Sequence, residues 1–398
     1  MGKRASSLKV KLNRNPEERE LFYTTRSLDI RPDRGPPIQT PQRGLTQPEL
    51  DAKALARYPL PLSSAISGVS RTLNSGEVAS LLTDNEFSEN QISSLDNLSQ
   101  RMQHSSLTFA VLQPSMSAVA NTLTQDKYRD KFLRMNMAIQ QQSGMQMVTV
   151  PWVEYSSKAA LECFETITRD ADFEPVFFLD TRTEPQRLRE ICDFIKQKIR
   201  TDEIHFVGLI HRPIRTTLAS CDELWSCLKD EDVALILTGV ERYDPNLRDI
   251  SGIHMNEFIL GDILLTEVRR RYVKPENSKK PRNTGRFPVS GVGSALRAFD
   301  KEELVVRQLR ELSQASLADE VARELGDGRF KVPIENYLEA GTDERKYDIV
   351  KGILRTHEFV ASQRELNRSR EYISAGDTDS YLSEKEVLGN SLRAVRFR

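Results

Sequence analysis

The feature that most constrains this fold is an apolar run that recurs at intervals of about 29 residues between Met147 and Val240. The four runs are MVTVPW at 147–152, EPVFFLD at 174–180, EIHFVGLI at 203–210 and VALILTGV at 233–240, and a polar, helix-like segment follows each one. Parallel neighbouring strands need a crossover long enough to hold a helix. The rhythm therefore predicts consecutive β-α units in a parallel sheet.

Further strands are expected at 107–113 and 250–255, and a brief extended piece at 286–290, which makes about seven strands in β-α order. This number favours a (β/α)8 core like that of a TIM barrel over an open doubly wound sheet. An eighth strand is not evident. We expect a polar N-terminal arm with short helices at 1–104, a barrel-like core at 105–300 and a helical C-terminal region at 301–398.

Helical spacing of apolar residues predicts several helices. Ser88 is the expected N-cap of the second of two short helices in the arm. A helix is expected from about Asn256 to Tyr272, and the 301–326 segment is predicted to be entirely helical. The other expected helices are at 76–85, around Tyr128–Ile139, and at 157–170, 186–199, 216–230, 344–367 and 383–395.

Composition argues against a chain that binds nucleic acid or membranes through its overall charge. The formal net charge is −1, so such affinity must come from local patches. Apolar runs are too short for a membrane span, and no secretory signal is expected. The four cysteines lack C-x-x-C spacing and are expected to be small buried hydrophobes in a reducing cytoplasm.

Polar residues stand where predicted strands end, which is where enzymes with parallel sheets place their chemistry. Asp180 ends the 174–180 run, His211 follows the 203–210 run and Glu241 follows the 233–240 run. His254 lies in the 250–255 strand. These four residues are the candidate catalytic set, because carboxylates and imidazoles serve as nucleophiles, acids and bases. The alternative is that they are simply polar where the chain returns to solvent.

Two further readings concern histidines. His211, His254 and Glu241 could hold a metal ion, although the sequence contains no H-E-x-x-H or H-x-H motif and indicates no particular cofactor. His205 lies inside its strand, so we expect it to be a buried structural histidine.

Two segments could contact phosphate. The turn containing Gly291, Gly293 and Ser294 is predicted to open a helix, whose N–H groups could hold a phosphate, or it is a plain tight turn. The linker 269–286 is strongly basic and could contact a nucleic-acid backbone, or it is a solvated loop. Its candidate nucleic-acid-binding residues are Arg269, Arg270, Arg271, Lys274, Lys279, Lys280 and Arg282.

These features suggest a cytoplasmic enzyme acting on a phosphate-bearing substrate, most plausibly nucleic acid or a nucleotide. The specific hypothesis is base exchange (transglycosylase-like) or glycosyl-bond chemistry, with Asp180 at an oxocarbenium-like centre and His211 or Glu241 moving protons. One alternative is a non-catalytic scaffold whose C-terminal helices bind a protein partner, and another is a metal-assisted hydrolase. No membrane partner is expected.

Overall fold

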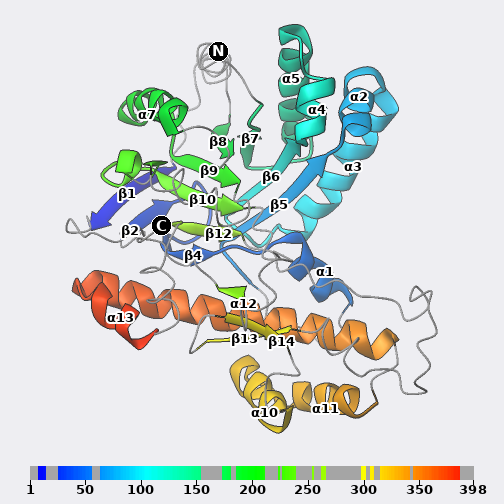
Figure 1. Cartoon of the computed structure of the whole chain (residues 1–398), viewed down its shortest axis with the longest axis vertical. Helices are drawn as coiled ribbons and strands as arrows, with labels where there is room; N and C mark the ends of the chain where they lie inside the picture. The colour runs from blue at the N-terminus through cyan, green and yellow to red at the C-terminus, as the bar shows by residue number, and fades with distance from the viewer. Residues whose placement is uncertain are drawn as a thin grey trace.

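A computed structural model describes residues 8–14, 26–55, 63–153, 173–180, 185–210, 223–224, 226–238, 253–254, 261–265, 297–301, 305–308, 314–340 and 344–385. Its centre is a six-stranded parallel sheet in the order β4-β12-β10-β9-β8-β7 (Figure 1). The strands are β4 (Gln42–Arg43), β7 (Met147–Val150), β8 (Glu174–Asp180), β9 (Phe206–Ile210), β10 (Ala234–Thr238) and β12 (Ile263–Leu265). The four strands of the regular repeat are therefore confirmed as parallel neighbours.

A second parallel pair, β5 (Ile66–Leu73) and β6 (Leu107–Pro114), lies beside this sheet. Leu45, just after β4, forms a parallel bridge with Ser67 of β5, and its N–H donates to the Ile66 carbonyl at 2.9 Å. Among the described residues no backbone ladder joins β6 to β7, so the predicted barrel is not shown as a closed ladder. What is shown is an α/β protein with parallel strands and helices.

Side chains take the place of a ladder between β6 and β7. The Thr149 hydroxyl of β7 donates to the Ala110 carbonyl of β6 at 2.6 Å. Gln140 donates to the Thr149 carbonyl at 2.9 Å and accepts from its N–H at 2.8 Å, and Asn136 donates to the Leu112 carbonyl at 2.8 Å. Asn136, Gln140 and Thr149 are fully buried. We call this set the β6–β7 seam.

Two apolar clusters lie on the two faces of the parallel strands. The helix-facing cluster packs Val207, Leu209 and Leu235 against helices. The hairpin-facing cluster joins one face of the strands to an antiparallel β1–β2 hairpin (β1, Lys9–Arg14; β2, Ser27–Arg31), which also pairs with β3 (Ile38–Gln39). Its strand residues are Ile66, Leu107, Phe109, Val111, Met147, Val176, Phe178, Phe206, Ile210, Ala234, Ile236, Ile263 and Leu265. Strands covered on both faces read as continuous apolar runs, which is the pattern seen in the sequence.

Six helices lie in the described part of the first 200 residues, and α7 is the helix that the repeat predicted at 186–199. They are α1 (Gln47–Leu55), α2 (Ser75–Thr83), α3 (Asn85–Arg101), α4 (Met116–Asn121), α5 (Asp126–Gln142) and α7 (Pro185–Arg200). Asp84 caps α3 by accepting from Glu86 N–H at 2.9 Å, so the predicted cap at Ser88 was wrong. The predicted helix at 157–170 lies outside the described residues.

The C-terminal part is organised by α12 (Glu344–Ala375), the long orange helix below the sheet in Figure 1. It packs against α1 and β4, and buried Arg43 of β4 bonds Glu49 of α1 at 3.1 Å and Glu358 of α12 at 3.5 Å. The shorter helices α10 (Gln314–Leu325), α11 (Lys331–Ala340) and α13 (Thr378–Glu384) pack on it.

Four sequence-based expectations fail between 250 and 326. Part of the predicted helix at 256–272 is instead strand β12, and 253–254 is not a strand of the parallel sheet. The segment after the glycine turn is strand β13 (Arg297–Asp300), and part of the predicted 301–326 helix is strand β14 (Val305–Gln308). Short apolar runs fit helix and strand periods equally well, so only pairing partners decide between them.

Candidate functional site

The carboxyl end of the parallel sheet places one row of residues side by side. Asp180 of β8 pairs in register with Ile210 of β9, Ile210 with Thr238 of β10, and Thr238 with Leu265 of β12. Ile210 and Leu265 belong to the hairpin-facing cluster, and Thr238 alternates with Ala234 and Ile236 onto the same face. We call these four positions the carboxyl-edge row. Neighbouring strands are about 4.8 Å apart, so the Asp180 and Thr238 backbones are separated by about 10 Å.

Of the four candidate catalytic residues, the structure describes the backbone of two. Asp180 is the last residue of β8, as expected. His254 lies in β11 (Ile253–His254), which pairs antiparallel with β14 in a separate three-stranded sheet, with His254 opposite Val305. The prediction that His254 ends a strand of the parallel core was therefore wrong. His211, which directly follows Ile210, and Glu241 lie outside the described residues.

The proposed phosphate and nucleic-acid contacts remain predictions. Gly291, Gly293, Ser294 and the basic segment 269–286 all lie outside the described residues. The structure shows which strands flank these two segments in the chain. In the chain the segment follows β12, and the glycine turn precedes β13, whose partner β14 also pairs with the His254 strand.

Gln113 is a buried polar residue at the carboxyl end of β6 that sequence reasoning missed. Its side-chain nitrogen donates to the Trp152 carbonyl, and its oxygen accepts from the Trp152 N–H at 3.1 Å. Since both ends of the amide are occupied, Gln113 fastens the segment after β7 to β6. A glutamine at the end of an apolar run was the only signal for it in the sequence.

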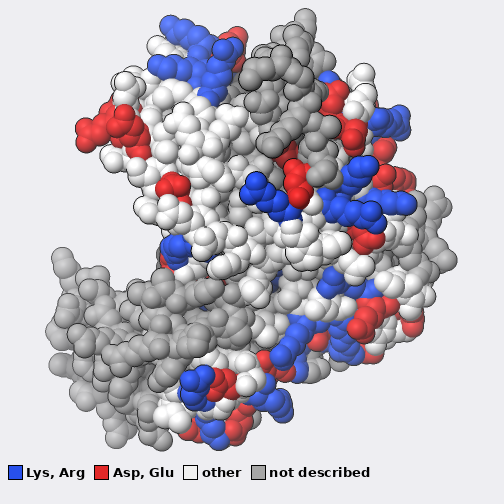
Figure 2. All heavy atoms as spheres, turned by 180° about the vertical axis from the view of Figure 1, so that it is seen from behind, with Lys and Arg blue, Asp and Glu red and all other residues white. Residues whose placement is uncertain are grey.

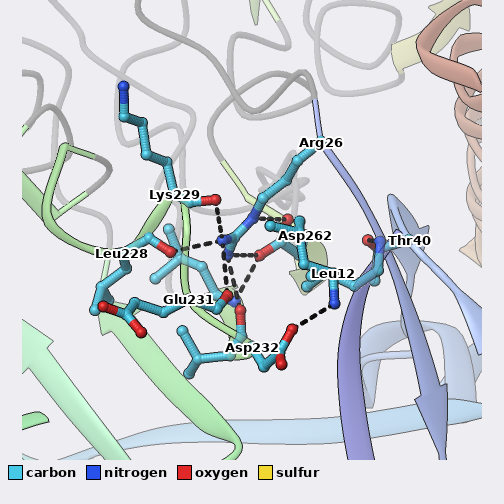
Figure 3. A network of polar contacts seen from close by, with 11 residues as sticks. Leu12, Arg26, Thr40, Leu228, Lys229, Glu231, Asp232 and Asp262 are labelled. Atoms are coloured by element: carbon cyan, nitrogen blue, oxygen red, sulfur yellow. Dashed lines mark hydrogen bonds and ion pairs between the residues drawn. The ribbon is translucent and has the colours of Figure 1, made fainter. Parts of the chain in front are cut away.

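A buried ion pair lies at the opposite, amino-terminal end of the sheet (Figure 3). Arg26, just before β2, donates to Asp262, just before β12, at 2.6 and 3.2 Å, and both side chains are fully buried. The remaining guanidinium donors reach the carbonyls of Leu228 at 2.7 Å and Val233 at 2.8 Å, with longer bonds to Lys229 and Glu231. The network is saturated by the protein's own groups, so its role is to anchor the hairpin.

His205 also lies at the amino-terminal side, just before β9. Its Nδ1 is 3.0 Å from Glu174 and its Nε2 is 3.1 Å from Asp202. Burial pushes the pKa of His205 down, but the bonds and charges of Glu174 and Asp202 outweigh burial and leave that pKa raised. The expectation of a buried structural histidine is confirmed, since its side chain is 7% exposed.

Metal and membrane functions find no support in the part of the chain that is described. No group of three or more His, Cys, Asp or Glu side chains there could hold a metal ion. No helix within those ranges is long and apolar enough to cross a bilayer. The proposed ligands His211 and Glu241 fall outside those ranges, so the metal hypothesis remains a prediction.

No protein-family model matches the chain, and no curated protein matches it at a significant level.

Proposed function

We propose that β4, β5, β6, β7, β8, β9, β10 and β12 close into one parallel barrel whose carboxyl end carries an active site. Support comes from the Leu45–Ser67 bridge at one junction and the β6–β7 seam at the other. The hairpin-facing cluster supports it too, because strands from both sheets contribute to a single apolar interior. In this arrangement β4 and β5, from the predicted arm, supply the strands that the sequence left unassigned.

The carboxyl end is the proposed site because the amino end is bonded to the β1–β2 hairpin. The Leu12 N–H of β1 donates to Asp232, just before β10, at 2.7 Å, and Arg26 pairs with Asp262, just before β12. Substrates of parallel β/α enzymes bind beyond the carboxyl ends of the strands. The observation that carries the proposal is the carboxyl-edge row, which aligns Asp180 with Thr238 and with the residue preceding His211.

The proposed reaction is base exchange or glycosyl-bond cleavage in a nucleic acid or nucleotide. Position 180 alternates with Val176 and Phe178 onto the barrel-interior face, where an aspartate would meet a substrate held at the mouth. Its carboxylate would attack or stabilise the oxocarbenium-like carbon as the base leaves. His211 or Glu241 would move the proton of the leaving base, and the basic segment 269–286 would hold phosphates.

The test is incorporation of labelled free purine or pyrimidine bases into nucleic acid by the full chain. Asp180→Asn should lower the exchange rate at least about 100-fold while leaving nucleic-acid binding intact. Asp193→Asn is the matched control, since Asp193 is an exposed carboxylate on α7, the helix after β8. Equal rates for Asp180→Asn and the wild type would refute the role of Asp180.

Binding is tested separately. Replacing the seven candidate Lys and Arg residues of 269–286 with Gln should flatten the dependence of binding on salt concentration, because fewer counterions are released. Weak binding that does not respond to salt in the wild-type chain would count against a nucleic-acid substrate and favour the scaffold alternative.

A further inference from the structure

The first turns of α5 project past the carboxyl end of β6. The helix runs antiparallel to that strand: Asn136 bonds the Leu112 carbonyl, and Gln140, one turn later, bonds Thr149, whose hydroxyl reaches back to the Ala110 carbonyl. From Asn136 the helix extends back 10 residues to its start, which is about 15 Å. β6 continues only two residues beyond Leu112, or about 7 Å.

This projecting end of α5 carries an excess of positive charge. Between 115 and 142, cations outnumber acids four to two, although the whole chain has a net charge of −1. The cations are Lys127, Arg129, Lys131 and Arg134, and the acids are Asp126 and Asp130. Figure 2 shows Lys and Arg atoms gathered at the upper left, over this end of α5.

Three of these cations share one face of the helix. Lys127, Lys131 and Arg134 are exposed and are spaced by four and three residues, so they lie along one stripe. The Lys131 ammonium also donates to the Leu82 carbonyl of α2 at 2.6 Å, which holds it in place. Arg129 instead pairs with Asp126, its neighbour on the same helix.

An exposed aromatic ring lies beside the cations. Tyr128 is 39% exposed, and the Lys127 ammonium lies 4.7 Å from the centre of its ring. Met116, on the preceding helix α4, is 44% exposed. Surfaces that bind single-stranded nucleic acid combine cations that contact the backbone with aromatic rings on which bases stack. We call Lys127, Tyr128, Lys131 and Arg134 the α5 patch.

We propose that the α5 patch binds single-stranded nucleic acid, with phosphates beside Lys127 and Arg134 and a base stacked on Tyr128. A strand bound there would lie at the rim of the proposed active site, so this assignment rests on the proposed function. It deepens that function by naming a polymer strand, rather than a free nucleotide, as the substrate. A single strand fits better than a duplex, because its unstacked bases can lay a face on the tyrosine ring.

The experiment measures binding of a fluorescein-labelled single strand of mixed sequence to the full chain by fluorescence anisotropy. Tyr128→Ala should weaken binding about 5- to 100-fold, because a stacked base is lost. Tyr128→Phe keeps the ring and should bind like the wild type. These side chains are exposed, and circular dichroism checks that each variant folds.

The electrostatic part of the patch is tested by salt dependence. Lys127→Gln combined with Arg134→Gln should reduce the slope of log affinity against log salt by about 1.4, since each phosphate contact on a single strand contributes about 0.7. Arg101→Gln combined with Arg200→Gln is the matched control. It removes two exposed cations from the last residues of α3 and α7, near the amino-terminal ends of the strands that follow, and should leave the slope unchanged.

Two results would overturn the assignment of the α5 patch. One is a wild-type chain that binds no single strand, or that binds duplex equally well. The other is single-strand binding that Tyr128→Ala and the Lys127/Arg134 double variant leave at wild-type strength. In either case base exchange into a free nucleotide, and its loss in Asp180→Asn, would still test the proposed function by itself. Conversely, strand binding lost in Tyr128→Ala but with no exchange by the wild type would support the patch and refute the proposed reaction.

Discussion

Removing the Arg26 guanidinium is expected to be among the most damaging single changes to this protein. Arg26→Met would leave Asp262 as a fully buried carboxylate that keeps the 2.8 Å hydrogen bond from the Leu235 N–H but loses its cationic partner. It would also strip donors from the carbonyls of Leu228 and Val233. Breaking a buried ion pair from one side costs about 3–5 kcal/mol, because the remaining charge loses its compensation.

The assay is urea denaturation of the wild type and of a double-mutant cycle. Arg26→Met should lower the free energy of unfolding by about 3–5 kcal/mol. Combining it with Asp262→Leu should cost about 1–3 kcal/mol less than the sum of the two single changes, since the double variant buries no unpaired charge. Arg26→Lys should restore only part of the lost free energy of unfolding, because the lysine ammonium cannot bond a carboxylate and several carbonyls at once as the planar guanidinium does.

The matched control is Arg71→Met, which breaks an ion pair with Glu77 in which the Arg71 side chain is 42% exposed. Exposed pairs contribute at most about 1 kcal/mol, so this variant should stay close to the wild type. If Arg26→Met were no more destabilising than Arg71→Met, the Arg26–Asp262 pair would not anchor the hairpin.

Three other predictions follow from single sites. Because the folded-state pKa of His205 is raised, the stability that its protonated ring contributes is fully present below the unfolded pKa of about 6.5 and is lost as pH rises through the folded pKa. The midpoint of urea unfolding should therefore fall over that pH range in the wild type and not in His205→Gln; the same pH profile in both proteins would contradict the prediction. Gln140→Leu should lower the free energy of urea unfolding by about 2–4 kcal/mol, because the backbone N–H and C=O of Thr149 lose their hydrogen-bond partner. An unchanged free energy of unfolding would show that the β6–β7 seam does not stabilise the fold. A Cβ at Gly208 would lie 2.3 Å from the Phe178 ring, so Gly208→Ala should lose about 1–3 kcal/mol, and Phe178→Leu in the same chain should recover part of that loss if the clash is the cause.

The sequence alone determined the parts of the fold that repeat. β7, β8, β9 and β10 could be located because a strand covered on both faces is a short continuous apolar run, and these runs recur at a regular interval in the sequence. The same pattern placed Asp180 at a strand end, because the run stops there. Apolar runs and their ends depend on consecutive residues, so they can be predicted without knowing the tertiary structure.

Tertiary structure decided the rest, because the deciding partners are distant in sequence. The two residues of β4 carry no strand pattern of their own, and they join the sheet only because β12, more than 200 residues later, offers them a parallel edge. Ile263–Leu265 and Val305–Gln308 became strands rather than helices for the same reason. His254 lies outside the parallel sheet because its strand, β11, pairs with β14.

The two buried ionic clusters show this division most clearly. Nothing near Arg26 or Arg43 in the chain identifies Asp262 or Glu358 as a partner. A charged residue in a polar N-terminal segment is normally read as solvated, and it is buried here because burial becomes tolerable only once the partner carboxylate is in place. Periodicity therefore predicted where the sheet would be, and pairing across the fold decided which strands complete it.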